Sequence, residues 1–209
     1  MRVIDKLIEK NKAWADQVKQ EHPDFFKGLA YEQHPEILWI GCVDSRVATD
    51  LITGMEPGQL FVHRNVANLV PSTDFNSLSV IQYAVDYLKV KYIIVCGHYN
   101  CGGVIAAYNR EELGLIDNWI GNIRNVYHTY KDEIEALKTT EEQTDLLCEL
   151  NVKQQVRNVC NTSIVQNAWK KGQEITVCGM IYSVKDGLLK DLGIKYDSTE
   201  TIPDAYIFK

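Results

Sequence analysis

Two short segments of this chain combine side chains that bind transition metals with glycines directly beside them. Residues 41–46 read GCVDSR, and residues 97–103 read GHYNCGG. Together they supply two thiols, one imidazole and one carboxylate, from Cys42, Cys101, His98 and Asp44. All four are ligand types that Zn²⁺ accepts in proteins. The sequence therefore predicts a zinc site, and the number of ligands indicates what kind of site it is.

The spacing of these ligands favours a catalytic site over a structural one. His98 and Cys101 are close enough in sequence for one turn to bring both to the same ion, and Cys42 would complete the set. Structural zinc sites usually take four thiolate or imidazole ligands, whereas three ligands and an open fourth position are typical of catalytic zinc. An isolated His-x-x-Cys pair more often binds no metal, and a lone cysteine after a strand usually packs in the core.

The neighbours of these ligands favour a functional site. Asp44 and Arg46 follow Cys42 by two and four residues, and a carboxylate beside an arginine is a poor core residue but a good site residue. Gly102 and Gly103 follow Cys101 and can let the backbone approach a small ligand, with free N–H groups where a helix begins.

The elements that must position these loops alternate between strand and helix. Apolar runs predict strands over 36–41, 59–64, 91–96 and 174–179, with a possible short return strand at 188–190. Helices are predicted from about 75 to 89, from 102 onward, and over 117–137 and 142–170. This alternation predicts an α/β fold with a mainly parallel, four-stranded sheet flanked by helices. Both loops then lie at the carboxyl ends of strands, where such sheets place their chemistry.

Residues 1–33 form a separate helical arm in this interpretation. The arm is amphipathic and is interrupted at Pro23. We expect it to pack on a partner subunit, although packing on its own chain is an equally good interpretation. With the α/β zinc core over 34–209, the whole of 1–209 is predicted to be one domain.

Composition narrows the classes of partner and compartment. A net charge of −6 argues against non-specific nucleic-acid binding, and no apolar run reaches the roughly 18 residues of a membrane span. The first residues lack the apolar region of a signal peptide. We therefore expect a cytoplasmic protein whose six cysteines are reduced, with those outside the two loops filling the core.

Taken together, the two motifs resemble those of the β-class carbonic anhydrases. Cys-x-Asp-Ser-Arg and His-x-x-Cys-Gly-Gly carry the resemblance, which extends from the arm to about residue 190 and includes FVHRNVAN at 61–68. It implies one Zn²⁺ per subunit, bound by Cys42, His98 and Cys101. It also implies reversible hydration of CO₂ to bicarbonate and a proton. The expected assembly is a homodimer, often paired into a tetramer, with the arm around the partner.

The resemblance also implies roles for residues around the metal. Zinc with three imidazoles lowers the pKa of its bound water to about 7, and two thiolates weaken this effect, so we expect a more alkaline working range. The zinc-bound hydroxide attacks CO₂, while Asp44, kept ionised by Arg46, orients the hydroxide. The residues implied for the CO₂ pocket are Gln33 of the facing subunit, Phe61, Val66, Tyr83 and the N–H of Gly102.

One bacterial branch of that family is regulated by bicarbonate, and the chain has the matching residues. Trp39, Arg64 and Tyr182 would hold the regulatory bicarbonate, while core packing of Trp39 and an edge position of Tyr182 are the alternatives. In that branch Asp44 leaves Arg46 and ligates zinc in an inactive state promoted by low pH and by bicarbonate. Ala48 stands where the family often has proline, which loosens the Asp44 loop but removes no ligand.

Three other functions fit parts of the pattern. The same scaffold could hydrolyse a CO₂ analogue such as carbon disulfide, depending on access to the pocket. A non-catalytic metal or bicarbonate-sensing module is a second possibility, disfavoured by Asp44 and Arg46 beside an open ligand position. A nucleotide-binding protein is the third, and the chain has no G-x-G-x-x-G after its first strand.

Overall fold

The first 34 residues form a unit of two helices. The computed structural model describes residues 2–208, and the contacts divide the chain into residues 1–34 and 35–209. Helix α1 runs over Val3–Glu21 and α2 over Phe25–Leu29, on either side of Pro23. The Trp14 and Phe26 rings meet edge to face, 5.7 Å apart. No described residue of α1 is buried, and its apolar side chains Val3, Ile4, Leu7 and Ile8 are all exposed.

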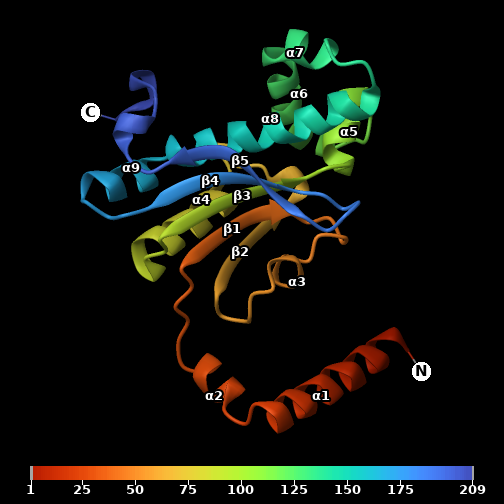
Figure 1. Cartoon of the computed structure of the whole chain (residues 1–209), viewed down its shortest axis with the longest axis vertical. Coiled ribbons are helices and arrows are strands. Elements are labelled where there is room, and N and C mark those ends of the chain that lie inside the picture. The colour runs from red at the N-terminus through yellow and green to blue at the C-terminus, as the bar shows by residue number, and fades with distance from the viewer. Residues whose placement is uncertain (1, 209) are drawn as a thin grey trace. The chain divides into compact units, whose positions relative to one another are not determined.

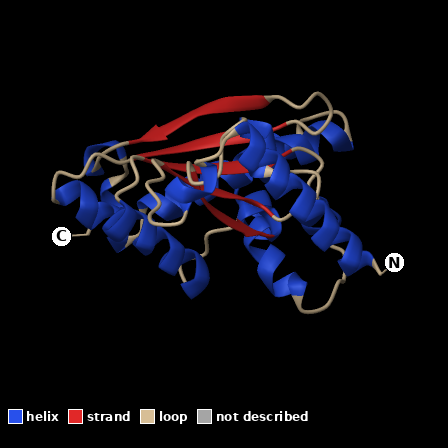
Figure 2. Cartoon of the chain, turned by 90° about the horizontal axis from the view of Figure 1, so that it is seen from below, coloured by secondary structure: helices blue, strands red, loops and turns tan. Residues whose placement is uncertain are grey.

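The second unit is built on one twisted sheet (Figure 2). Its strands are β1 (Ile37–Cys42), β2 (Leu60–Asn65), β3 (Tyr92–His98), β4 (Thr176–Tyr182) and β5 (Leu189–Tyr196), in the order β2-β1-β3-β4-β5 (Figure 1). The first four pair in parallel, as the continuous apolar runs predict.

The fifth strand corrects the predicted count of four. Strand β5 pairs antiparallel with β4, with an irregularity between Gly179 and Met180. It is eight residues long rather than a short return strand. Its first three residues are exposed, and from Asp191 onward exposed and half-buried residues alternate. Such a polar edge strand lacks the apolar run that marks a buried strand, which is why the sequence did not indicate its length.

The helices follow the predicted order but are more finely divided. They are α3 (Thr49–Thr53), α4 (Phe75–Gln82), a π-helical turn (Tyr83–Leu88), α5 (Gly102–Asn109), α6 (Ile116–Thr129), α7 (Lys131–Glu135), α8 (Thr140–Cys160) and α9 (Ser163–Lys170), with 3₁₀ turns at Val66–Asn68, Thr199–Thr201 and Asp204–Tyr206. Asp74 caps α4 by accepting hydrogen bonds from the amides of Asn76 and Ser77. Within residues 2–208, every helix is too short or too polar to cross a membrane.

The two faces of the sheet are packed differently. One face, including Leu38, Ile93 and Val177, forms a large core with buried residues of α4, α8 and α9. On the other face, Trp39 and Tyr182 belong to a smaller cluster that includes Val47 and the half-buried Ile52 of α3. Cys96, Cys148 and Cys160 are buried and Cys178 is half-buried, all as free thiols, in line with their predicted role as core fillers.

The topology brings the two sequence motifs to the same edge of the sheet. Strands β1 and β3 are neighbours and run parallel, with Gly41 opposite Cys96. Because β1 ends at Cys42 and β3 at His98, both motifs begin where these strands end.

Candidate metal centre

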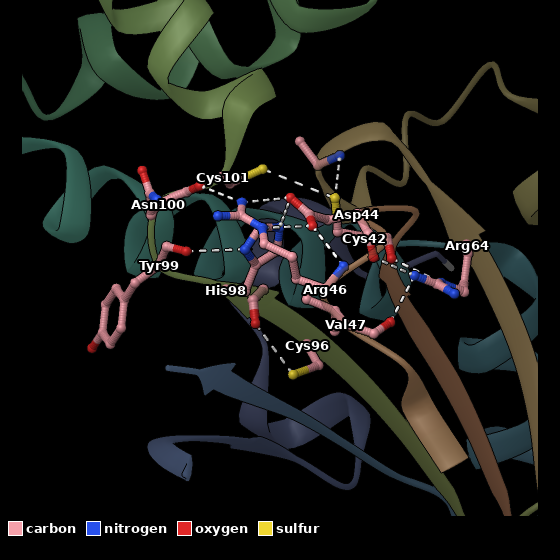
Figure 3. Close-up of polar contacts among 12 residues, drawn as sticks. Cys42, Asp44, Arg46, Val47, Arg64, Cys96, His98, Tyr99, Asn100 and Cys101 are labelled. Atoms are coloured by element: carbon pink, nitrogen blue, oxygen red, sulfur yellow. Dashed lines mark hydrogen bonds and ion pairs between the residues drawn. The ribbon is translucent and has the colours of Figure 1, made fainter. Parts of the chain in front are cut away.

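Three buried side chains converge at this edge. Cys42 ends β1, His98 ends β3, and Cys101 is the N-cap residue of α5. Their ligand atoms lie within 4.8 Å of one another, and the two Sγ atoms are 3.9 Å apart. The three residues are 5%, 1% and 2% exposed, so the protein shields them from bulk solvent. Figure 3 shows Cys42 and His98 at the ends of their strands and Cys101 just before α5.

The geometry fits one zinc ion. Two thiolates on a tetrahedral zinc ion, each about 2.3 Å from the metal, lie about 3.8 Å apart. The Nδ1 of His98 pairs with the carbonyl oxygen of Tyr99 at 3.0 Å, which leaves Nε2 as the atom free to ligate. Nε2 is buried and has no hydrogen-bond partner among the described residues. A buried polar atom without a partner is costly, and a metal ion would satisfy it.

The two thiols are electrostatically unequal. A hydrogen bond from Cys101 lowers the pKa of Cys42, and His98 and the amide of Ala67 lower it further. The same Cys42–Cys101 bond and burial raise the pKa of Cys101. The pair by itself therefore favours a single negative charge, and a bound cation is what would stabilise the second thiolate.

Asp44 lies beside this centre and is held by Arg46. The Arg46 guanidinium donates from Nε to Oδ1 at 2.9 Å and from Nη2 to Oδ2 at 2.7 Å. This bidentate pair keeps the pKa of Asp44 well below its usual range. Arg46 Nη2 also donates to the carbonyl of Asn100 at 3.1 Å, which ties the first loop to the second. Asp44 Oδ2 is 3.7 Å from His98 Nε2, so an ionised carboxylate faces the ligand cluster.

Arg64 fixes the backbone of the same loop. Its Nε donates to the carbonyl of Cys42 at 2.8 Å, and its Nη2 donates to those of Asp44 and Val47 at 2.8 and 2.7 Å. The guanidinium therefore faces the loop, as Figure 3 shows.

The residues predicted to line a CO₂ pocket lie on several elements. Phe61 of β2 and Tyr83 have their rings 5.8 Å apart. Val66 lies against α5, since a Cβ added to Gly103 would be 3.0 Å from Val66 Cγ1. Gly102 is exposed at the first position of α5. Gln33 is exposed within the first unit, which is described by itself.

Two of the three predicted regulatory residues share a buried cluster. Trp39 and Tyr182 are 2% and 9% exposed and pack on the same face of the sheet. Trp39 Nε1 is buried and has no hydrogen-bond partner among the described residues. Arg64 bonds instead to the loop carbonyls described above.

Three backbone groups of the site were not foreseen from the sequence. They are the carbonyl of Tyr99, the carbonyl of Asn100, and the amide of Ala67, which donates to Cys42 Sγ at 3.4 Å. Every residue has such groups, so only the fold selects them. An asparagine after His98-Tyr99 is a weak turn signal, and Asn100 does adopt a positive φ of 56°.

This α/β sheet, with a Cys₂His centre and a carboxylate–arginine pair where its strands end, defines a class of catalytic metalloprotein. Known proteins identify the class. The chain is 48% identical over 192 residues to a carbonic anhydrase of Emericella nidulans, covering 92% of this chain and 84% of the relative. It is 37% identical over 205 residues to a carbonic anhydrase of Candida albicans, covering 95% and 71%.

Solved structures agree with the sequence comparisons. The β-carbonic anhydrase of Coccomyxa, in complex with acetazolamide, superposes with a TM-score of 0.90 at 39% identity, covering 96% of this chain and 90% of that one. One of two tetrameric β-carbonic anhydrases of Sordaria macrospora gives 0.87 at 38%, covering 92% and 98%. The carbonic anhydrase family model matches residues 37–189, and this chain belongs to that family, in its β class. β-Carbonic anhydrases use zinc, and the Cys42–His98–Cys101 group can bind one ion.

Proposed function

We propose that this carbonic anhydrase interconverts CO₂ and bicarbonate at the Cys42–His98–Cys101 centre, with Asp44 and Arg46 beside it. The observation that carries the proposal is the buried, unpartnered Nε2 of His98, within 4.8 Å of both thiols and 3.7 Å from an ionised carboxylate. Cys42, His98 and Cys101 would hold the metal. Zinc, when bound, would supply a Lewis acid that lowers the pKa of a water molecule.

The chain's own residues then set orientation and electrostatics. Asp44, ionised by its pair with Arg46, only accepts hydrogen bonds, so it orients a group that has a proton to donate. Arg46 holds this acceptor through two bonds and anchors itself on Asn100. Preorganised groups of this kind need no rearrangement during the reaction. Two anionic sulfur ligands reduce the acidity of the centre, which favours an alkaline working range.

We propose that the substrate pocket combines apolar side chains with one donor. Phe61, Val66 and Tyr83 would provide a surface suited to CO₂, and the Gly102 N–H would bond to its oxygen. Gln33 would come from a second copy of the chain. The Sordaria relative described as tetrameric and the exposed apolar side chains of α1 support a homodimer or tetramer. Light scattering of the purified protein measures this, and a monomer would contradict it.

The decisive experiment compares cysteine variants. Cys42→Ser should lose bound zinc and CO₂ hydration together, because Cys42 is a predicted ligand. Cys178→Ser is the matched control, since Cys178 is a half-buried free thiol outside the centre. It should keep both. Zinc bound at full stoichiometry by Cys42→Ser, or its full activity, would overturn the assignment. Assays with carbon disulfide would show whether the same centre also hydrolyses that analogue.

Regulation by bicarbonate is a second proposal, favoured by Trp39. Its buried Nε1–H has no partner among the described residues and could donate to an anion, in the cluster that also contains Tyr182. We propose that bicarbonate and low pH favour a state in which Asp44 leaves Arg46 for the metal. The relatives reported above are fungal and algal, so they do not support assignment to the bacterial branch.

The regulatory test should spare the Asp44 loop. Arg64→Ala would free that loop, because Arg64 holds three of its carbonyls. Tyr182→Phe removes only the hydroxyl group, and Trp39→Phe removes the Nε1–H together with one ring of the indole. We expect steep inhibition by bicarbonate and by low pH in the wild type and weaker inhibition in both variants. A shallow, one-proton pH profile without a bicarbonate effect in the wild type would contradict regulation. The six free thiols support our further proposal of a cytoplasmic location.

A further inference from the structure

The loop between β2 and α4 turns through two consecutive left-handed residues. Ala67 has φ 62° and Asn68 has φ 50°, a region that residues other than glycine rarely adopt. Both are buried, at 0% and 2% exposure. A backbone in this conformation persists only where its surroundings hold it, and such positions cluster at functional sites.

Helix α8 holds this loop through two buried amides. Asn151 Nδ2 donates to the Ala67 carbonyl at 3.0 Å, and Gln155 Oε1 accepts from the Val70 amide at 2.8 Å. Gln155 Nε2 also donates to Asn151 Oδ1 at 3.0 Å, so one amide orients the other. Both side chains lie one helical turn apart and are 1% exposed.

The loop so held reaches the metal centre through a backbone amide. The N–H of Ala67 donates to Cys42 Sγ at 3.4 Å. The peptide that carries this N–H is fixed on its other side, where Trp119 Nε1 donates to the Val66 carbonyl at 2.8 Å. Asn151 fixes the following peptide. The two peptides on either side of the Ala67 Cα are therefore both held by side chains.

Such a donor matters for a centre with two sulfur ligands. A hydrogen bond from an N–H group to a metal-binding thiolate withdraws charge from the sulfur atom and fixes the orientation of the ligand. Groups that bond to metal ligands in this way change the affinity for the metal. We propose that Asn151, oriented by Gln155, is a positioning residue that holds the Ala67 N–H on Cys42 Sγ and so controls how Cys42 holds the metal. The proposal rests on the proposed function in taking Cys42 as a zinc ligand.

The test compares Asn151→Leu with Val159→Ala. Leucine has nearly the shape of asparagine but cannot donate to Ala67. Val159 lies on the same helix and is fully buried, but it belongs to the core against the sheet, so its truncation destabilises α8 without changing the loop's hydrogen bonds. We expect Asn151→Leu to release zinc to a chelator about 10–100 times faster than wild type. Its pH profile of kcat/KM should shift to alkaline pH. Val159→Ala should keep both wild-type values.

A readout on the metal-free protein separates positioning from catalysis. In Asn151→Leu, the peptide that spans 60–70 should exchange its amide hydrogens faster than in Val159→Ala. Gln155→Met, which leaves the Asn151 bond to Ala67 available, should give smaller changes in the same direction, and it carries the test if Asn151→Leu does not fold.

Zinc release and pH profiles equal to those of Val159→Ala would overturn the inference. Failure of the proposed function would look different, because Cys42→Ser would then retain zinc.

Discussion

The two loops at the metal centre are held in place by different forces. After β1, the loop over residues 43–48 is fixed by guanidinium groups. Arg64 binds its carbonyls and Arg46 binds Asp44, whose side chain is 17% exposed against 48% for Arg46. After β3, the chain leads directly into α5, and the His98 side chain is fully buried. One loop is held by charge at the edge of solvent, and the other is held by packing.

This difference assigns different tasks to the two loops. The packed loop supplies His98 and Cys101, whose positions cannot drift without disturbing the core. The charged loop supplies Asp44, whose bonds to Arg46 can be broken at modest cost because half-exposed ion pairs contribute little to stability. We therefore expect changes in the packed loop to affect metal retention and folding. Changes in the charged loop should affect rate alone.

The largest expected effect is on the packed loop. Cys101→Ser should lose zinc and reduce kcat/KM by at least about 10³-fold, since the metal supplies the Lewis acid. Zinc stoichiometry by elemental analysis and the initial rate of CO₂ hydration measure this. Cys160→Ala is a suitable control because Cys160 is a buried free thiol on α8. A Cys101→Ser protein with wild-type zinc content would contradict the assignment of metal retention to the packed loop.

Asp44→Asn should separate rate from metal retention. The amide cannot carry the charge that pairs with Arg46, so we expect kcat/KM to fall about 10²–10³-fold, as for the loss of one preorganised electrostatic group. Zinc content should stay near one per chain, because the three ligands are unchanged. Loss of zinc from this variant would show that the charged loop also retains the metal.

Adjacent glycines in α5 give a test of packing alone. A Cβ on Gly103 would lie 3.0 Å from Val66 Cγ1 and 3.3 Å from Ala67 Cβ, whereas one on Gly102 meets nothing within 4 Å. We expect Gly103→Ala to be less stable than Gly102→Ala by about 1–3 kcal/mol, as for overpacking. Denaturant unfolding of both metal-free variants measures the difference. Equal stabilities would show that the 66–70 loop can shift to make room for the added methyl group.

The smallest effect on stability is expected for Arg46→Lys. Lysine keeps the charge but cannot make the bidentate contact with Asp44, so the rate should fall while stability changes by less than about 1 kcal/mol. Rates at low and high salt sharpen the test, because a single exposed ammonium is screened more than a bidentate pair. A larger loss of stability would show that the charged loop contributes to folding stability as the packed loop does.

Much of the site was predictable because its parts are local in sequence. The apolar runs before Cys42 and His98 indicate buried parallel strands, and parallel neighbours bring their ends together. Zinc as cofactor and the α/β sheet are confirmed. The division of 142–170 into α8 and α9 was missed, since Thr162 caps α9 without a break in the apolar pattern.

The features that could not be predicted from the sequence depend on contacts between residues that are far apart in the chain. The charge of Arg64 suggests that it binds an anion, yet its guanidinium donates to three backbone carbonyls. Ala67 takes a conformation usually marked by glycine, so no residue type signals the turn. Strand β5 is polar because it lies at an edge. In each case the partner, not the residue itself, decides the role.

The amide bonds from α8 also have a consequence for the order of folding. Asn151 and Gln155 reach the 66–70 loop from 84 and 85 residues along the chain. The entropy of closing such long loops is lost before the contacts form, so these bonds cannot precede the docking of α8. The hydrogen bond from the Ala67 N–H to Cys42 Sγ therefore forms late in folding. We expect added zinc to slow unfolding of the finished protein rather than to speed its folding.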